Sequence, residues 1–416
     1  MTLFCGIDFG TSNSTVSLAD ESRAWLIALE GEAATLPSAV FWDADGGAPE
    51  FGRAAMAAYL RGEDGRLMRG LKSTLGSALI DERTAVGARA VSFKEVLTRF
   101  IAHMTTRLRA EAPGADHVVL GRPVHFMDGD AAGDAKAQAV LEAIARGQGF
   151  REVAFQYEPI AAALTYEQGV SSEELVLIVD IGGGTSDFSV VRVSPTRAKA
   201  ADRADDILAN DGIRVGGTDF DRLLSLAEVM PLLGYKATTK GGAGLMPNHY
   251  FLDLATWHRI NFLYTQRCLA DLKAFRHEID HPELLDRLTK VITDRNGHAV
   301  AMAVEAGKIA LSDQEFVRLN LSALTGGPNP MISRERFNAA VAAPLDRIGA
   351  MLGAVLDQAG VTAAQISTVF MTGGSSGLPA LRSVVQAALP GVAIATGDML
   401  GSVGTGLALD ARRKFA

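Results

Sequence analysis

The sequence of 416 residues contains few cysteines, few aromatic residues and no long apolar run. Its two cysteines, Cys5 and Cys268, cannot build a disulfide framework, so we expect reduced thiols and a cytoplasmic location. No uninterrupted apolar run approaches the roughly 20 residues of a membrane-spanning helix, and no membrane span is expected. The first residues enter an apolar segment directly, without a charged leader, so no secretory signal is expected either.

Positive charge is also scarce. The chain has 40 Lys and Arg against 48 Asp and Glu, which gives a net charge of −8. A protein that coats nucleic acid needs a basic surface, so nucleic acid is not an expected partner. Apolar residues, by contrast, make up 48% of the chain, and this content with this length predicts a well-buried globular body of two lobes.

The most informative segment lies near the N-terminus. Residues 3–9 are mostly apolar and carry Asp8 near their end. The turn that follows consists of small residues: Gly10, Thr11, Ser12 and Asn13. Consecutive backbone N–H groups in such a turn form an anion-binding concavity, which predicts a hairpin whose tip can wrap a phosphate. Plain hairpins use similar turns, so one copy alone leaves this interpretation open.

A second copy of the pattern occupies residues 175–193. There Asp180 takes the place of Asp8, and a longer turn follows: Gly182, Gly183, Gly184, Thr185, Ser186 and Asp187. Both copies have an apolar strand, a carboxylate, a small-residue turn and a returning strand. Two such hairpins in one chain predict a duplicated domain that holds a phosphate chain between its halves.

Strands and helices alternate along the rest of the chain. Helical spacing or small-residue content predicts helices over residues 52–59, 92–109, 131–146, 334–358 and 402–412. Short apolar runs predict strands over residues 25–29, 36–42, 118–120, 153–156, 316–321 and 369–372. Pro159 suits the first turn of a helix that starts at Glu158, and residues 226–304 are expected to be mainly helical. This alternation predicts an α/β architecture with helices on both faces of each sheet.

Five motifs in this order carry a family resemblance. They are the two hairpins, the helix start Glu158-Pro159, the segment Gly216-Gly217-Thr218-Asp219-Phe220-Asp221 and the turn Gly373-Gly374-Ser375. The chain resembles the actin/hexokinase/heat-shock ATPase superfamily, and within it the nucleotide-binding domain of the seventy-kilodalton heat-shock (DnaK-like) chaperones. More narrowly, residues 230–235 and 248–251 resemble the short YegD-like branch. The implied fold is a two-lobed actin-like ATPase fold of duplicated ribonuclease H-like domains, each lobe with an inserted subdomain.

The resemblance implies domain boundaries. Lobe I would cover residues 1–170, with a core of 1–25 and 92–170 and an inserted subdomain of 26–91. Lobe II would cover residues 171–416, with a core of 171–217 and 305–416 and a mainly helical inserted subdomain of 218–304. The polar residues 171–174 mark the expected boundary between the lobes.

The resemblance also implies a site for ATP or ADP with Mg²⁺. Asp8 and Asp180 would hold waters of a phosphate-bound Mg²⁺, which prefers carboxylates plus water. The positions implied to contact the nucleotide are Gly10, Thr11, Ser12, Asn13, Gly182, Gly183, Gly184, Gly216, Gly217, Glu305, Lys308, Ser312, Gly373, Gly374 and Ser375.

Four residues match catalytic positions of the family. Glu158 and Asp187 would orient the attacking water, and Thr185 would lie near the terminal phosphate. Lys72 would offset the negative charge that develops on the transferred group. A structural interpretation stands beside each role: the aspartates cap turns, Glu158 stabilises the start of its helix, and Lys72 is a solvated surface lysine.

The sequence departs from the family at the adenine end. The two arginines that sandwich the base correspond here to Ile309 and Gly377, and neither can stack a guanidinium on a base. We therefore expect weaker or less selective adenine binding. The arginine of the family's proline–arginine switch is also missing, with Lys136 or Gln138 in its neighbourhood after Pro123.

The chain ends soon after the last helix of the ATPase pattern. Neither the apolar interdomain linker nor the β-rich peptide-binding domain of the family is therefore expected. Client binding would then use another surface or another protein.

Three further patterns are interpreted as structural features or chance matches rather than as functional sites. Residues 65–73 nearly match a P-loop, but an extra residue spoils the spacing and no strand precedes it. His277-Glu278-Ile279-Asp280-His281 fits a zinc-protease motif, but Pro282 disfavours the helix that two ligands on one face need. The aromatic residues of segment 250–264 are interpreted as subdomain core, with a partner-docking face as the alternative.

Several functions stay open at this stage. The leading one is a Mg-ATP-dependent hydrolase and chaperone-like switch, whose lobes close on ATP and open on ADP. The alternatives are a low-turnover nucleotide-binding regulator or scaffold, and a small-molecule kinase of the same superfamily. A filament-forming actin relative is disfavoured, because the middle insertion resembles neither actin nor its bacterial relatives. The implied partners are ATP, co-chaperones or exchange factors and client proteins, with no nucleic acid and no membrane.

Overall fold

A computed structural model describes residues 3–87, 89–200, 203–242, 244–398 and 400–416. The chain forms two compact units. The first consists of Met1–Gly217, Asp346–Gly377 and Leu381–Ala416, and the second of Thr218–Leu345 and Leu378–Ala380. Both predicted lobe cores contribute to the first unit, and the division into two lobes at residue 170 stays a prediction.

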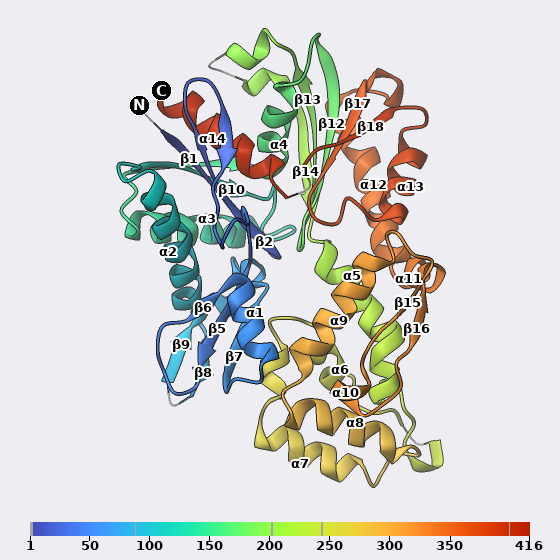
Figure 1. Ribbon diagram of the computed structural model, residues 1–416. Coiled ribbons are helices and arrows are strands. Elements are labelled where there is room, and N and C mark those ends of the chain that lie inside the picture. The colour runs from blue at the N-terminus through green and yellow to red at the C-terminus, as the bar shows by residue number, and fades with distance from the viewer. Residues whose placement is uncertain (1–2, 88, 201–202, 243, 399) are drawn as a thin grey trace. The chain divides into compact units, whose positions relative to one another are not determined.

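The first unit contains two sheets with the same plan (Figure 1). In the first sheet the strand order is β11-β10-β1-β2-β3. Strand β1 pairs in parallel with β10 and antiparallel with β2, and β4 also pairs with β2. The strands are β1 (Phe4–Phe9), β2 (Asn13–Ala19), β3 (Ala24–Leu26), β4 (Thr35–Pro37), β10 (His117–Arg122) and β11 (Glu152–Tyr157).

The second sheet repeats this order as β18-β17-β12-β13-β14. Its strand β12 pairs in parallel with β17 and antiparallel with β13, as β1 does with β10 and β2. The strands are β12 (Glu174–Ile181), β13 (Ser186–Val193), β14 (Ile207–Ile213), β17 (Thr368–Thr372) and β18 (Ala393–Thr396). The predicted α/β actin-like fold with duplicated halves is thereby confirmed.

The helices of the first unit pack on its sheets, and α1 packs on the smaller one that follows the first hairpin. They are α1 (Gly52–Leu60), α2 (Phe93–Glu111), α3 (Ala131–Gly147), α4 (Glu158–Glu167), α12 (Ala342–Ala359) and α13 (Pro379–Ala388), which both start in the second unit, and α14 (Ser402–Phe415). Local signals set their ends: the Ser92 side chain accepts a hydrogen bond from the Glu95 N–H at the start of α2, and Pro159 lies in the first turn of α4.

Helices α4 and α14 cross at very short range. A β-carbon at Gly406 in α14 would lie 1.8 Å from the Ala161 carbonyl oxygen in α4. A β-carbon at Gly6 in β1 would likewise lie 2.6 Å from Leu407 Cβ. One apolar core therefore joins the strands of both sheets through these two helices, with members such as Phe4, Ile178 and Leu407.

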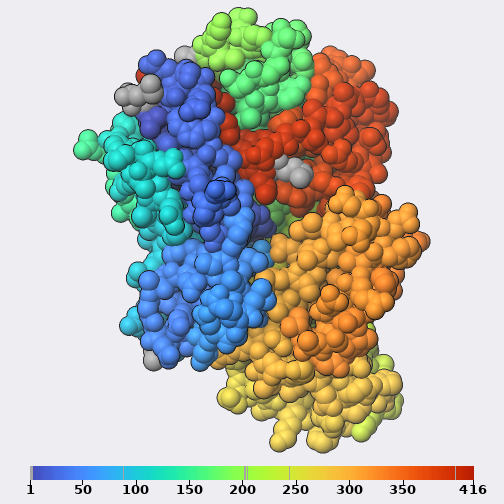
Figure 2. All heavy atoms as spheres, viewed as in Figure 1, coloured from blue at the N-terminus to red at the C-terminus, as the bar shows by residue number. Residues whose placement is uncertain are grey.

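A smaller β-structure follows the first hairpin. Strands β5 (Ala39–Asp43), β6 (Glu50–Phe51) and β7 (Gly65–Arg69) form one sheet, and β8 (Arg83–Val86) pairs with β9 (Arg89–Ser92). In the space-filling view this blue segment adjoins the cyan segment that contains α2 (Figure 2). Residues 65–69 thus form a strand, which confirms that the near match to a P-loop is not one.

The second unit is mainly helical, as predicted. Its helices are α5 (Gly217–Leu224), a π-turn (Ser225–Val229), α6 (His249–Leu254), α7 (Gln266–Phe275), α8 (Pro282–Thr293), α9 (Gly297–Ala310), α10 (Ser322–Thr325) and α11 (Arg334–Ala340). A hairpin of β15 (Phe316–Arg318) and β16 (Met331–Ser333) follows α9. Tyr250, Phe251 and Trp257 are buried, which confirms the core interpretation of this segment.

One predicted helix was wrong. Residues 334–358 form two helices, α11 and α12 (Ala342–Ala359), which are bent by 65°. Pro344 has no N–H to bond the Ala340 carbonyl, and its ring clashes with that carbonyl, so one continuous helix cannot form. Among the described residues, no single helix is long and apolar enough to cross a membrane. Only α11 and α12, taken together as one bent pair, have the length and hydropathy of a membrane-spanning helix.

The remaining sequence patterns carry no site. Residues 277–281 lie between the end of α7 and the start of α8, so the two histidines share no helix face, as expected.

Cys5 and Cys268 are both buried and free of disulfides. Their burial raises the pKa of Cys5 to about 12 and that of Cys268 to about 11, and both thiols therefore stay protonated at neutral pH.

Candidate active site

The tips of the two predicted phosphate hairpins meet in the first unit. A β-carbon at Gly183 would lie 2.3 Å from Ser12 Oγ, and one at Gly184 would lie 2.7 Å from Thr11 Oγ1. Such short approaches exclude a side chain at either position unless a neighbour moves. The structure therefore brings together the two segments that the sequence marks as copies of one motif.

The first tip is held by Ser38, a residue that sequence reasoning missed. The Ser38 N–H donates to the Ser12 carbonyl (2.8 Å), and its hydroxyl donates to the Gly10 carbonyl (2.7 Å). The Ser38 hydroxyl also lies 2.9 Å from the Ser14 hydroxyl. Ser38 is fully buried, so these bonds form away from solvent and fix the tip.

The second tip is held mainly by backbone groups. The Gly217 N–H donates to the Gly182 carbonyl (2.9 Å), and the Ser375 N–H donates to the Ile181 carbonyl (3.0 Å). A β-carbon at Gly216 would lie 2.6 Å from the Gly184 nitrogen. The segments around residues 216 and 375 were predicted from the resemblance, and both lie directly against this tip.

Gly373 lies beside the second carboxylate. Its backbone has φ of +84°, a conformation that favours glycine, and a β-carbon there would lie 2.5 Å from Asp180 Oδ1. Gly374, next in the chain, is exposed. The turn at residues 373–375 therefore packs against the Asp180 end of β12.

Four carboxylates share one region of negative charge. Enclosure by protein and repulsion from Glu158 raise the pKa of Asp8 to about 7 and that of Asp187 to about 7. Burial raises the pKa of Asp180 well above its ordinary value, and Glu158, Asp187 and Asp8 raise it further. Such mutual effects require short separations, so the predicted metal and catalytic carboxylates form one cluster.

Lys72 supplies a positive charge in this cluster. Its Nζ lies 2.5 Å from Glu158 Oε1, and the two side chains are only 6% and 9% exposed. Burial opposes the charged ammonium, but Glu158, Asp8 and Asp187 outweigh it and raise the pKa of Lys72. The lysine is therefore protonated at neutral pH, and its interpretation as a solvated surface residue is wrong.

Local structure delivers both partners of this ion pair. Lys72 lies in a short 3₁₀ turn (Leu71–Thr74) that begins after Gly70, whose φ of +67° suits glycine. Glu158 is the first residue of α4. A β-carbon at Gly121 would lie 3.5 Å from both Asp8 Oδ1 and Glu158 Cγ, so the end of β10 lies beside these two carboxylates.

Asp187 is held from the first half of the chain. The Val124 N–H donates to Asp187 Oδ1 at 2.7 Å, and Asp187 is only 1% exposed. Its second oxygen is buried and has no hydrogen-bond partner among the described residues. A buried acceptor in this state suits a ligand, because an unpaired buried carboxylate oxygen is costly. Thr185, two residues earlier at the hairpin tip, is partly buried.

Arg122 positions the Val124 peptide. Its guanidinium donates to the carbonyls of Pro123 and Val124, both at 3.0 Å. The same group donates to Asp134 (2.8 Å) and Gln138 (2.5 Å) on α3. This arginine therefore couples α3 to the loop that bonds Asp187.

Sequence reasoning missed Arg122 because it looked for an arginine after Pro123. Of the two residues considered there, Gln138 binds Arg122, whereas Lys136 forms an exposed ion pair with Asp81 at 2.7 Å. An arginine beside a proline at a strand end was readable as a signal, but its partners lie 12 and 16 residues away.

Comparisons with known proteins agree with this fold. Residues 287–397 match the Hsp70 protein family, and residues 86–225 match the MreB/Mbl protein family. The chaperone protein HscA of Citrobacter koseri is 26% identical over 92% of this chain, and so are those of Escherichia coli and Salmonella typhimurium. The chain is an Hsp70-like domain with the actin-type ATPase fold. It spans about half the length of these relatives, 53% in each case.

Glu305, Lys308 and Ser312, which were predicted to contact adenosine, belong to the second unit, on α9 and just after it. Lys308 Nζ lies 2.7 Å from Asp221 Oδ1, and both side chains are buried. Asp221 closes the segment that begins at Gly216, so this ion pair joins α5 to α9 within the second unit. The part of these three residues in adenosine binding stays a prediction.

Asp8 and Asp180 fit a Mg²⁺ held through water. Their raised pKa values mean that Lys72 offsets only part of the negative charge in the cluster, and a divalent ion would supply the remaining compensation. Among the described residues no group of three or more His, Cys, Asp and Glu side chains is arranged to hold a metal ion. Mg²⁺ does not need such a group, because it keeps several waters and binds one or two carboxylates plus substrate phosphates.

Proposed function

We propose that this Hsp70-like domain binds Mg-ATP at the paired hairpin tips and hydrolyses it, as part of a chaperone-like switch. The observation that supports this most is the Lys72–Glu158 ion pair, buried among Asp8, Asp180 and Asp187 where the tips meet. A protonated lysine within a buried carboxylate cluster is expensive to maintain for stability alone. Its chemistry suits a site that handles phosphate charge.

Phosphate binding would use the backbone. N–H groups of the first tip (Gly10 to Asn13) and the second tip (Gly182 to Thr185) would donate to phosphate oxygens. Asp8 and Asp180 would hold Mg²⁺ through water, and Mg²⁺ would neutralise charge on the phosphate chain. The hydrogen bonds from Ser38 to the first tip keep its donors in place before the nucleotide arrives.

The hydrolytic step would use Glu158, Asp187 and Lys72. The two carboxylates would accept hydrogen bonds from a water and orient its oxygen toward the terminal phosphorus. As the new P–O bond forms, the bond to the bridging oxygen breaks, ADP leaves with that oxygen, and the water's protons pass to solvent and phosphate. Lys72 would neutralise charge on the transferred group throughout.

Partners and location follow as part of the proposal. The relatives carry the name chaperone, and by analogy this chain would work with co-chaperones, exchange factors and client proteins in the cytoplasm. Nucleotide-driven closure of the predicted lobes would be the output of the switch. The YegD-like branch remains our narrower assignment.

The adenine end favours one alternative. Ile309, at the position of a base-stacking arginine in the family, is 60% exposed, and Gly377 offers almost no contact surface. We therefore expect calorimetry to show weak ATP binding with little discrimination against GTP. Sub-micromolar ATP binding with strong rejection of GTP would contradict this expectation. Weak base contacts also suit a low-turnover nucleotide-binding regulator.

The test is phosphate release from ATP by purified protein. In Lys72→Ala and Glu158→Gln we expect at least about a 100-fold loss of turnover, because each change removes a charge used in the reaction. Lys136→Ala is the matched control, since that lysine forms an exposed ion pair with Asp81, and its turnover should stay within about twofold.

The other outcomes are equally informative. Mg-ATP binding by the unaltered protein without phosphate release would favour the regulator. Transfer of the phosphate to an added hydroxyl compound would favour the kinase. Unchanged turnover in both Lys72→Ala and Glu158→Gln would contradict the proposed roles.

A further inference from the structure

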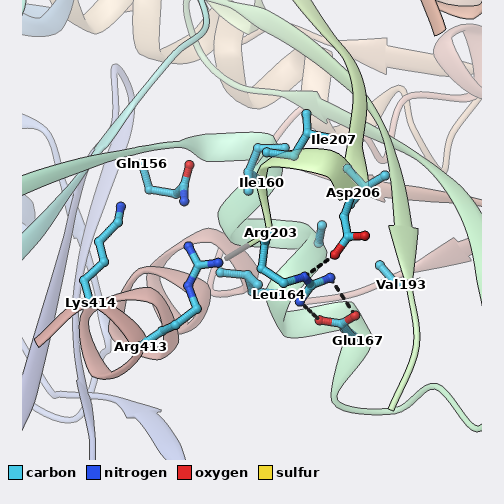
Figure 3. A pocket seen from close by; sticks show the side chains of 12 residues that line it. Gln156, Ile160, Leu164, Glu167, Val193, Arg203, Asp206, Ile207, Arg413 and Lys414 are labelled. Atoms are coloured by element: carbon cyan, nitrogen blue, oxygen red, sulfur yellow. Dashed lines mark hydrogen bonds and ion pairs between the residues drawn. The ribbon is translucent and has the colours of Figure 1, made fainter. Parts of the chain in front are cut away.

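A cavity of about 470 Å³ lies in the first unit among β11, α4, β13, β14 and α14 (Figure 3). None of the residues that line it belongs to the candidate active site. Its volume lies within the roughly 300–1,000 Å³ range typical of small-molecule sites. The cavity therefore has the size of a ligand site, and its lining indicates what it would bind.

Much of the wall is apolar. Ile160 and Leu164 from α4 line it, as do Val191 and Val193 from β13 and Ile207 from β14. Figure 3 shows Ile160 and Ile207 together on one side of the hollow. A ligand with an apolar body would remove this surface from water, which favours binding.

The acidic side of the cavity is already neutralised. Arg203 donates to both carboxylate oxygens of Glu167, at 2.7 and 2.9 Å, and its Nε donates to Asp206. Asp206 also pairs with Arg197. Glu167, Arg203 and Asp206 are buried. Arg197 also pairs with Glu173, which lies near Arg192, so three arginines meet three carboxylates. This side therefore offers no surplus charge to a ligand.

The basic side is not balanced in this way. Arg413 and Lys414 share one carboxylate, Asp410, which lies 2.5 Å from each of them and is fully buried. Gln156 donates to the same carboxylate at 3.1 Å. Arg413 Nε is buried and has no hydrogen-bond partner among the described residues. Two cations that line the hollow thus meet one carboxylate, and one positive charge is left over at its edge.

We propose that this cavity binds an organic monoanion with an apolar body, such as a medium-chain carboxylate. The carboxylate would accept hydrogen bonds from Arg413 and Lys414, and the chain would lie on Ile160, Leu164 and Ile207. A single surplus positive charge matches a monoanion, and the apolar wall disfavours inorganic phosphate. The inference does not depend on the proposed ATPase function.

The test is a calorimetric titration of the whole chain with octanoate. We expect saturable binding to one site, tightening about fourfold per added methylene up to decanoate. Octanol has the same chain without the charge and should bind at least about tenfold more weakly. Arg413→Gln should weaken octanoate binding at least about tenfold. The matched control is Arg151→Gln, whose side chain is 82% exposed, and it should bind as the unaltered protein does.

A second variant keeps the test decisive if Arg413→Gln does not fold. Leu164→Trp fills the hollow from a partly exposed position and should abolish octanoate binding while the melting temperature stays near that of the unaltered protein. Absence of saturable binding at millimolar octanoate would overturn the proposal. So would equal binding of octanol, displacement of octanoate by equimolar inorganic phosphate, or unchanged binding in both variants.

Discussion

The two halves of the first unit have the same strand order but different hairpin tips. The first tip is a short turn whose carbonyls are held by a side chain, that of Ser38. The second tip contains three consecutive glycines and is held by backbone N–H groups, including that of Gly217. One duplicated scaffold thus supports two hairpin tips that are fixed in different ways.

The chemistry is also divided unequally. The first half supplies Lys72, from the segment that follows its hairpin. Among the described residues it is the only cation that acts on the carboxylate cluster. The first half also supplies Glu158, from α4. The second half supplies Asp187 and the glycine segments that pack on its tip. Duplication therefore explains the scaffold and the paired aspartates, and unequal additions to each half explain the proposed reaction.

The largest expected effect comes from the point where the halves share a core. In Gly406→Ala the new methyl would lie 1.8 Å from the Ala161 carbonyl, so α14 must move away from α4. We expect a loss of about 3 kcal/mol in the free energy of unfolding, measured by denaturant titration. The control is Gly353→Ala in α12. A β-carbon there would meet no neighbouring group within 4 Å, and alanine favours a helix more than glycine does, so this variant should gain stability. Equal stability of Gly406→Ala and the unaltered protein would mean that the helices do not cross so closely.

A smaller effect is expected at the second tip alone. In Gly216→Ala the new methyl would lie 2.6 Å from the backbone of residues 183 and 184, and the tip must shift. Nucleotide affinity should fall about tenfold, as measured by calorimetry. Gly182→Ala is the control in the same tip, because its methyl would meet only the Thr185 carbonyl at 3.6 Å, an ordinary contact. If both variants bind alike, the tip does not set affinity.

These examples show what the sequence could reveal. The paired hairpins, the helix that begins near Ser92 and the start of α4 at Glu158 were predicted correctly, because each depends on residues close together in the chain. The fully buried Ser38 and the Arg122 clamp were missed, because their partners are set by tertiary packing. The break of residues 334–358 was readable from Pro344, yet apolar spacing across it favoured one helix.

Protonation of Asp187 gives a pH-dependent comparison. Its pKa rises from 3.8 when unfolded to about 7 when folded, so the folded state holds the proton more tightly. The stability gained in acid is therefore lost as the pH rises from about 4 to 7. Asp187→Asn keeps an oxygen acceptor for the Val124 N–H and removes the charge. Its melting temperature should exceed that of the unaltered protein above pH 7 and equal it near pH 4; the reverse order would contradict the shift.

The smallest effect is expected at a surface contact between the halves. His125 Nε2 lies 3.0 Å from Asp211 Oδ1, and both side chains are about 40% exposed. Exposed pairs contribute less than about 1 kcal/mol. A double-mutant cycle with His125→Gln and Asp211→Asn should therefore give a coupling of about 0.5 kcal/mol or less. A coupling above about 2 kcal/mol would make this contact, rather than the shared core, the main link.

The central claim is that Asp8 and Asp180, one from each copy of the hairpin, serve one Mg²⁺-phosphate site. Calorimetric titration with ADP, with and without Mg²⁺, tests it most directly. We expect Mg²⁺ to tighten ADP binding at least about tenfold in the unaltered protein and to have no effect in the double variant Asp8→Asn/Asp180→Asn. Mg²⁺-independent binding in the unaltered protein, or full Mg²⁺ dependence in the double variant, would contradict the claim.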